Sequence, residues 1–184
     1  MNITQAAFGQ TAREPAAVAI DYAVDAEGLK AALRNLAGGV SIITAGEGEQ
    51  RSGATVTSAT ALSVEPARML VLLNRTSSTW PVVERFGHFC VNVVGPLHEG
   101  LASQFAGRGG LRGAERYRGF GWTTLASGAP VLDDAAAAID CEVEEAIERH
   151  SHVIVIGRVL AIRAAGGGSL VYGNGRYSAL PGNF

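Results

Sequence analysis

Two long runs of strand-forming residues, separated by only two polar residues, constrain the fold of this chain more than any other feature. The first run is AAAIDCEVEEAIER at 136–149, the second is HVIVIGRVLAIR at 152–163, and His150 and Ser151 stand between them. Two such runs with so short a connection are typical of an antiparallel β-hairpin. We therefore expect a pair of long antiparallel strands.

The rest of the chain repeats this β-type pattern in shorter runs, with few helices between them. Helical segments are predicted near 78–86 and 97–105. Further strands are predicted at 39–44, 53–58, 68–74, 88–94 and 169–173. Seven or more strands with hairpin spacing favour a mainly β, α+β fold, built as a closed or nearly closed antiparallel barrel with a few peripheral helices. A doubly wound parallel sheet is disfavoured.

One amphipathic helix is predicted to open the fold. Asp25 offers an N-cap, leucines at 29, 33 and 36 share one helical face, and Gly38 and Gly39 end the helix. The preceding residues, 1–22, have the composition of a flexible lead-in. A length of 184 residues then leaves one domain, which we expect at residues 23–184.

Composition and charge exclude several classes of function. The net charge of −2 and a pI of about 6.1 give no basic surface for nucleic acid or an anionic membrane. No secretory signal or run of about 18 apolar residues is present, so we expect a cytoplasmic protein that does not bind a membrane. Cys90 and Cys141 lie in apolar runs and are predicted to be buried free thiols.

Motif searches exclude the common nucleotide and hydrolase sites. The chain has 24 glycines, but no G-x-G-x-x-G lies between a predicted strand and a predicted helix. Walker A, H-E-x-x-H and G-x-S-x-G sequences are absent as well. No His, Cys or carboxylate spacing predicts a metal site.

Two hydroxyl-rich segments are the strongest sign of a binding site. GATVTSATALS at 53–63 lacks the alternation of a half-buried strand, and NRTSST at 74–79 leads into Trp80-Pro81, a predicted helix start. Hydroxyls and free backbone N–H groups there would suit an anion, and Arg75 would add one full charge. An ordinary Ser/Thr N-cap beside a solvated arginine explains the second segment equally well. Flavin mononucleotide, with a phosphate, a polyhydroxyl chain and a flat ring, would use all of these groups.

An ordered series of motifs then resembles the flavin reductase-like family, the small split-barrel reductases that supply reduced flavin to two-component monooxygenases. The resemblance covers about Leu29 to Leu180. Its motifs are LRNLAGGVSIIT, GATVTSATALSVEPARMLVLLNRTSSTW, FGHFCVNVV, LASQFAG, SHVIVIGRV and LVYGNGRYSAL. It implies an FMN-binding split barrel.

The resemblance also implies the residues of a flavin site. His152 would lie near the flavin ring and the bound nicotinamide and is the candidate catalytic residue, although an ordinary polar turn residue is the alternative. Ser151 stands where the family usually has Asp. Tyr172 and Tyr177 would border the same site or simply pack a barrel edge. The full set of implied cofactor-binding residues is Gly39, Thr55, Val56, Thr57, Ser58, Ala61, Leu62, Ser63, Arg75, Ser77, Ser78, Phe105, Ala106, Tyr172 and Tyr177.

In function, the resemblance implies an NAD(P)H:flavin oxidoreductase. Such an enzyme would transfer a hydride from NADH, or NADPH, to FMN or FAD, and the reduced flavin would diffuse to an acceptor such as a partner monooxygenase. The resemblance also implies a homodimer. Two alternatives stay open: a reductase of ferric complexes or a cobalamin precursor through reduced flavin, and a non-catalytic flavin-binding module.

Overall fold

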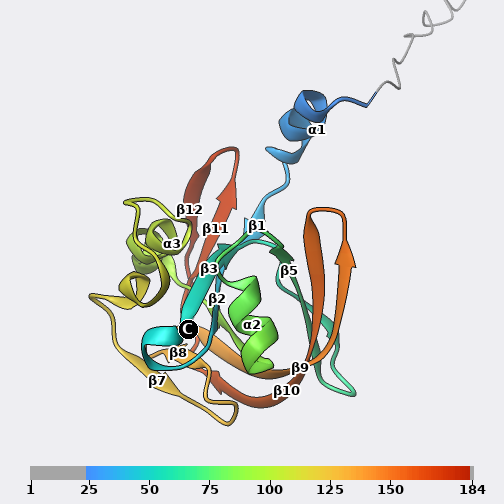
Figure 1. Cartoon of the computed structure of the whole chain (residues 1–184). Coiled ribbons are helices and arrows are strands. Elements are labelled where there is room, and N and C mark those ends of the chain that lie inside the picture. Colours follow the sequence, from blue (N-terminus) through green and yellow to red (C-terminus); the bar gives the residue numbers. More distant parts are fainter. Residues whose placement is uncertain (1–23, 183–184) are drawn as a thin grey trace, which may run out of the picture.

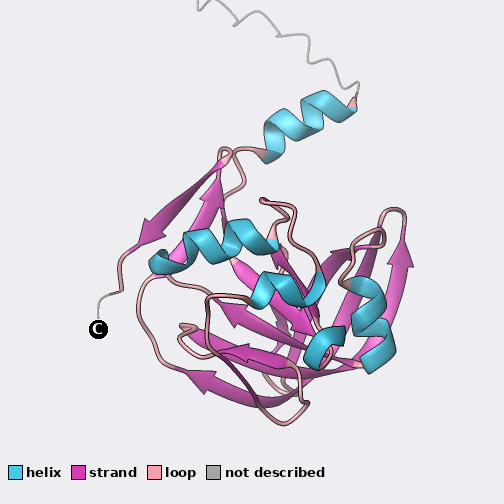
Figure 2. Cartoon of the chain, turned by 60° about the vertical axis from the view of Figure 1, so that its left-hand side comes forward, coloured by secondary structure: helices cyan, strands magenta, loops and turns pink. Residues whose placement is uncertain are grey.

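The computed structural model describes residues 24–182, so the predicted lead-in at 1–22 lies outside the described residues. The described part is mainly antiparallel β-sheet with three α-helices (Figures 1 and 2). The helices are α1 (Ala26–Leu33), α2 (Trp80–Phe86) and α3 (Glu99–Phe105). The strands are β1 (Gly38–Gly39), β2 (Ser41–Ala45), β3 (Ser52–Val56), β4 (Thr60–Ser63), β5 (Arg68–Asn74), β6 (His88–Val93), β7 (Trp122–Thr124), β8 (Pro130–Leu132), β9 (Ala137–Arg149), β10 (His152–Ala164), β11 (Ser169–Gly173) and β12 (Arg176–Leu180).

The predicted long hairpin is confirmed as β9 and β10. The two strands pair antiparallel from His152 opposite Arg149, and His150 adopts a left-handed φ of 52° in the turn. The register shifts next to Gly157. A Cβ at Gly157 would lie 2.4 Å from Cζ of Phe89, so only a glycine allows the phenyl ring to pack across the strand.

Seven strands form the main sheet, in the order β3-β2-β6-β9-β10-β5-β4. All of its neighbouring strands are antiparallel, which confirms the predicted α+β class. The edge strands β3 and β4 do not pair with each other, so in the described part of the chain the sheet is open at this seam. Smaller sheets join β1, β11 and β12, and β7 with β8. Sequence analysis missed the short strands β4, β7, β8 and β12.

The core lies on both faces of β2. All five residues of β2 are buried, which explains why SIITA lacks the alternation of a half-exposed strand. Ile43 packs in a cluster with Val83 of α2 and with residues of β5, β6 and β10. Ile42 packs on the other side, with Leu101 and Phe105 of α3. Helix α3 is therefore fixed to the sheet beside β3, where the site described below is formed.

Helix α1 begins after Asp25 as predicted but ends at Leu33, before Leu36 and the predicted stop at Gly38 and Gly39, and it stands apart from the core. The Asp25 carboxylate accepts a hydrogen bond of 2.6 Å from the Gly28 N–H, as expected of an N-cap. None of the residues of α1 is buried, and its leucines at 29 and 33 are each 51% exposed. Figures 1 and 2 show the helix projecting away from the sheets. No helix between residues 24 and 182 has the length and apolar character to cross a membrane.

Both cysteines are buried free thiols, as predicted. Burial, with a smaller effect from the Asp140 carboxylate, raises the pKa of Cys90 far above its ordinary value. The same two causes raise the pKa of Cys141 to about 12. Both groups are therefore neutral thiols in the core and are not nucleophiles.

Candidate functional site

Two adjoining pockets form a cleft between β3, α3 and the segment before α2. The larger pocket has a volume of about 520 Å³ and the smaller about 210 Å³. They share Thr55 and Ala106, so the two pockets are continuous with each other. A cleft of this size suits a cofactor-sized ligand. Nine of the fifteen predicted cofactor-binding residues line the cleft: Thr55, Val56, Thr57, Ser77, Ser78, Phe105, Ala106, Tyr172 and Tyr177.

Strand β3 and helix α3 form the rigid wall of the cleft. The Thr55 hydroxyl donates a hydrogen bond of 2.6 Å to the Ala102 carbonyl, which fastens the strand to the helix. Phe105 is 1% exposed and packs on the backbone of Gly53, where a Cβ would lie 2.6 Å from the Cε1 atom of the ring. Gly53 is therefore needed for this close approach of helix and strand.

The hydroxyl-rich segment before α2 forms the opposite wall of the larger pocket. Thr76, Ser77, Ser78 and Thr79 all line it, and α2 begins at Trp80 as predicted. The Ser77 hydroxyl accepts a hydrogen bond of 3.3 Å from the Trp80 N–H, so part of the segment does cap the helix. The Ser78 hydroxyl has only a long contact of 3.4 Å with Ser52, and its side chain is exposed to the pocket.

Three arginines that face the cleft supply its positive charge. Arg112 and Arg116 line the larger pocket, and Arg108 lines the smaller one. None of the three forms an ion pair with any residue between 24 and 182. Arg116 is held in place by hydrogen bonds from Nε to the Leu111 carbonyl, 3.0 Å, and from Nη1 to the Gly53 carbonyl, 2.7 Å. Three cations without a counter-ion in a chain of net charge −2 fit an anionic ligand.

Arg75 was predicted to contact the flavin phosphate but lies outside the lining of the cleft, whereas Arg112 and Arg116, which line it, were not predicted. The Arg75 guanidinium pairs with the Glu148 carboxylate at 2.9 Å and donates to the His150 carbonyl at 3.4 Å. It lines a neighbouring pocket at the turn of the β9–β10 hairpin, which shares Thr76 with the larger pocket, but Arg75 itself does not line the cleft. The structure therefore does not bring Arg75 together with Ser77 and Ser78. The glycine-rich sequence around Arg112 and Arg116 resembles a flexible loop and gave no signal for them.

The two predicted tyrosines close the smaller pocket. Tyr172 and Tyr177 are directly opposite each other in the β11–β12 hairpin, and their rings meet edge to face with centroids 5.1 Å apart. Both line the pocket with Val56 and Thr57. Two aromatic rings next to an exposed strand edge can hold a flat ring system by stacking.

His152 lies at the start of β10, outside the residues that line the cleft. Its side chain is exposed, and Nδ1 lies 2.9 Å from the Ser151 hydroxyl. Ser151, at the position where the family usually has Asp, therefore contacts the imidazole. His152 opposes Asn74, the residue before Arg75, in the pairing of β10 with β5.

Five further predicted residues also lie outside the lining of the two pockets. The Ser58 hydroxyl donates to the Leu72 carbonyl at 3.1 Å, and the Ser63 hydroxyl donates to the Pro66 carbonyl. Ala61 and Leu62 are exposed on the edge strand β4, and Gly39 is exposed in β1. All of these positions except Gly39 follow β3 along the chain, and none of the five lines the cleft within the described part of one chain.

The buried aromatic cluster below the cleft makes it rigid. Phe105, Tyr117 and Trp122 contact one another with centroids 4.7–5.7 Å apart. The Tyr117 hydroxyl donates to the Ser52 carbonyl at 2.5 Å, and burial raises the pKa of this phenol far above its ordinary value. Tyr117 is therefore a structural hydrogen-bond donor and not an acid or base.

The antiparallel α+β fold presents a cleft of hydroxyls, arginines and tyrosines, groups that suit an anionic cofactor with a flat ring. Comparison with known proteins identifies the class. Residues 33–181 match the model of the flavin reductase like domain. This match covers most of the chain, and the chain therefore belongs to the flavin reductase-like family.

Individual relatives agree with this assignment. An FMN reductase (NADH) RutF 2 of Methylorubrum extorquens is 39% identical over 160 residues, which cover 86% of this chain and 92% of the relative. Among solved structures, a putative flavin reductase from Haemophilus somnus has a TM-score of 0.81 and 28% identity and covers 85% of this chain and all of its own. BorF, the flavin reductase component of a bacterial two-component tryptophan halogenase, has a TM-score of 0.78 and 28% identity. The match covers 85% of this chain and 99% of BorF.

Proposed function

We propose that this protein is an NADH-dependent flavin reductase that acts on FMN, with FAD and NADPH as alternative substrates. The observation that carries the proposal is the cleft that Ser77 and Ser78 line together with Arg112 and Arg116, two arginines that form no ion pair with any residue between 24 and 182. A phosphate is the anion that such a set of hydroxyls and guanidinium groups recognises. The names of the relatives, FMN reductase (NADH) RutF, support the choice of FMN and NADH.

The flavin would lie along β3, in the order that the lining residues suggest. Its phosphate would contact Ser77, Ser78 and Arg116 in the larger pocket. Its ribityl chain would pass Thr55, where the two pockets meet, and its ring would lie near Thr57 and the tyrosine pair in the smaller pocket. The backbone and hydroxyl groups of β3 would supply the hydrogen bonds that orient the ring.

The chemistry requires positioning more than acid–base catalysis. A bound flavin would accept a hydride directly from a reduced nicotinamide stacked on its ring. The protein's task is to hold the two rings about 3–3.5 Å apart and to exclude water. We propose His152, oriented by Ser151, as a positioning residue for the nicotinamide, and Arg75 as its neighbour in the same turn region.

Relatives of this chain work with separate acceptor enzymes, since BorF is a component of a two-component halogenase. We propose that this protein likewise releases reduced flavin to a partner monooxygenase. We further propose that residues 23–184 form the one domain that does so, in the cytoplasm, where the free thiols of Cys90 and Cys141 would stay reduced.

We also propose a homodimer, in which a second copy covers α1. The resemblance implies a dimer, and α1 presents Leu29 and Leu33 to solvent, each 51% exposed, with Leu36 just after the helix 71% exposed. An apolar helix face of this kind usually packs against another surface. Light scattering at micromolar concentration should give twice the chain mass of 19.0 kDa, and a mass of one chain would contradict the proposal.

A single assay tests the proposed activity. Purified protein should oxidise NADH when FMN is supplied, at a rate that saturates with FMN. Parallel reactions with FAD, riboflavin and NADPH would rank the substrates. If FMN binds tightly but no flavin promotes oxidation of either nicotinamide, the protein is a binding module and not a reductase.

A further inference from the structure

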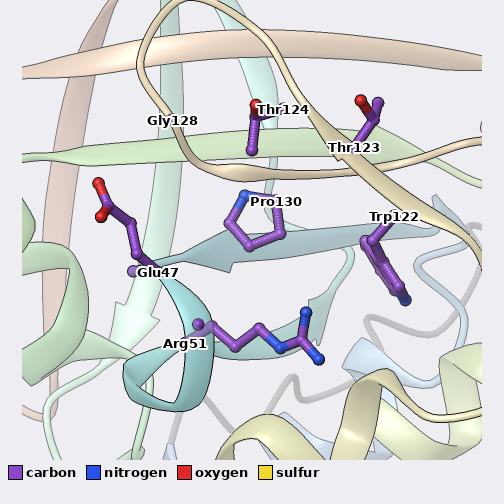
Figure 3. Close-up of a pocket in the computed structure, with 9 residues that line it drawn as sticks. Glu47, Arg51, Trp122, Thr123, Thr124, Gly128 and Pro130 are labelled. Carbon is purple, nitrogen blue, oxygen red and sulfur yellow. The ribbon is translucent and has the colours of Figure 1, made fainter.

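A pocket of about 470 Å³ lies on the opposite side of the aromatic cluster from the flavin cleft. It is formed by the 3₁₀ turn between β2 and β3, by β7 and by the start of β8 (Figure 3). None of its lining residues lines the flavin cleft. Nothing in the proposed reductase activity uses this pocket.

Arg51 is the unusual residue of the pocket. Its guanidinium carbon lies 4.4 Å from the centre of the Tyr117 ring, so the side chain is held by a cation–π contact. Between residues 24 and 182 it finds neither an ion pair nor a side-chain hydrogen bond, and its Nε atom is buried without a partner. Nε is closed off from the pocket, but the Nη atoms are not buried and make no hydrogen bond with the described residues, so they are the donors that a ligand in the pocket would meet.

Glu47 provides the opposite charge at the other side of the pocket. Its side chain is exposed and has no ion pair with the part of the chain that the structure describes. It stands between Gly46 and Gly48, whose positive φ angles of 79° and 50° form a tight turn. Figure 3 shows Glu47 and the Arg51 guanidinium pointing in different directions, with Pro130 between them. The two charges therefore do not neutralise each other.

We propose that this pocket binds a small zwitterion that carries a carboxylate and an ammonium group, as amino acids do. The carboxylate would accept hydrogen bonds from Arg51, whose planar fork suits it, and the ammonium would pair with Glu47. A doubly charged anion such as phosphate would be repelled by Glu47, and a simple amine would be repelled by Arg51. The indole of Trp122 forms an apolar wall of the pocket, because its N–H is already donated to the Tyr117 carbonyl at 3.0 Å.

Calorimetric titration of the full-length, flavin-free protein tests the proposal. The probes are β-alanine, 4-aminobutyrate and 6-aminohexanoate, which place the two charges at increasing separation. At least one should bind with saturation, and about tenfold more tightly than hexanoate, hexylamine or inorganic phosphate. Failure of all three to saturate, or equal binding of phosphate or hexanoate, would overturn the assignment.

Two variants and a matched control locate the binding. Arg51→Gln and Glu47→Gln should each weaken the best probe about tenfold or more. The Arg51 variant loses the contact with Tyr117 and could fold less well. Glu47 is exposed, so the Glu47 variant should fold normally and still tests the proposal. Arg118→Gln removes an exposed arginine outside the pocket and should leave the affinity unchanged. Unchanged affinity in the Glu47 variant, or an equal loss in the Arg118 variant, would refute the proposal.

Discussion

Arg116, rather than Arg75, should determine how well the protein distinguishes FMN from riboflavin, which lacks the phosphate. Arg116 uses Nε and Nη1 for the Leu111 and Gly53 carbonyls, and this leaves Nη2 for a ligand in the pocket. A hydrogen bond between a guanidinium and a phosphate contributes about 1.5–3 kcal/mol. Replacing Arg116 by Gln should therefore weaken FMN about 10- to 150-fold.

Arg75→Gln is the matched control for this prediction. The Arg75 side chain is 46% exposed and its partner Glu148 is 54% exposed, so their ion pair is a surface pair that contributes about 0–1 kcal/mol. Its loss should change FMN affinity by no more than about fivefold. A third variant, Arg112→Gln, alters an exposed side chain of the same pocket and is expected to fold normally.

The assay is titration of each variant with FMN and with riboflavin, followed by flavin fluorescence. The account predicts that riboflavin affinity stays within about twofold in the Arg116 variant, because riboflavin has no phosphate to lose. Thermal unfolding of the same samples reports whether the two lost carbonyl hydrogen bonds disturb the fold. Equal losses for FMN and riboflavin in a folded variant, or a larger FMN loss in Arg75→Gln, would refute the reasoning.

Four further predictions concern stability and assembly. Asn92→Ala should lower the free energy of unfolding by about 3 kcal/mol in denaturant titrations. The buried amide makes three hydrogen bonds, two to β2 and one to β8, and so joins β8 to the main sheet. A loss below about 1 kcal/mol would contradict this prediction. Gly53→Ala should cost about 1–3 kcal/mol and weaken FMN, since its Cβ would overlap Phe105, and an unchanged melting temperature would argue against the close contact. Burial raises the pKa of Cys141 from 9.0 to about 12, so the folded state favours the neutral thiol and the free energy of unfolding should fall as the pH rises from about 9 to 12. The Cys141→Ala variant should show a smaller fall over this pH range. An identical dependence of the free energy of unfolding on pH in the two proteins would disprove the contribution of Cys141. Leu33→Glu on α1 should convert a dimer to a folded monomer in light scattering, whereas an unchanged mass would remove α1 from the interface.

Much of the fold could be predicted because its signals are local. The β9–β10 hairpin, the bounds of β5 and β11, and the start of α2 at Trp80-Pro81 all follow from alternation, short polar turns and proline. The short strands β7 and β8 could not be predicted, because three residues carry too little periodicity. The apolar residues of α1 predicted a helix correctly. They could not indicate that no other part of the described chain packs against this face of the helix.

The residues that line the cleft were predictable where their position in a strand fixes them. They were not predictable where the direction of a side chain depends on partners distant in the sequence. Thr55, Thr57 and the tyrosine pair face one pocket because of their strand positions. Arg75 turns away because Glu148, on a strand two places along in the sheet, offers a carboxylate. Arg116 enters the cleft because the Gly53 carbonyl holds it there. Neither partner is visible from the neighbouring sequence.

The central claim is that the protein passes electrons from a nicotinamide to a flavin. The most direct test is to mix the protein, FMN and a limiting amount of NADH without oxygen and to follow the visible absorbance of the flavin. The account predicts that the absorbance is lost in proportion to the NADH added, one flavin for each nicotinamide, far faster than without protein. Persistence of oxidised FMN at the rate of the protein-free control would contradict it.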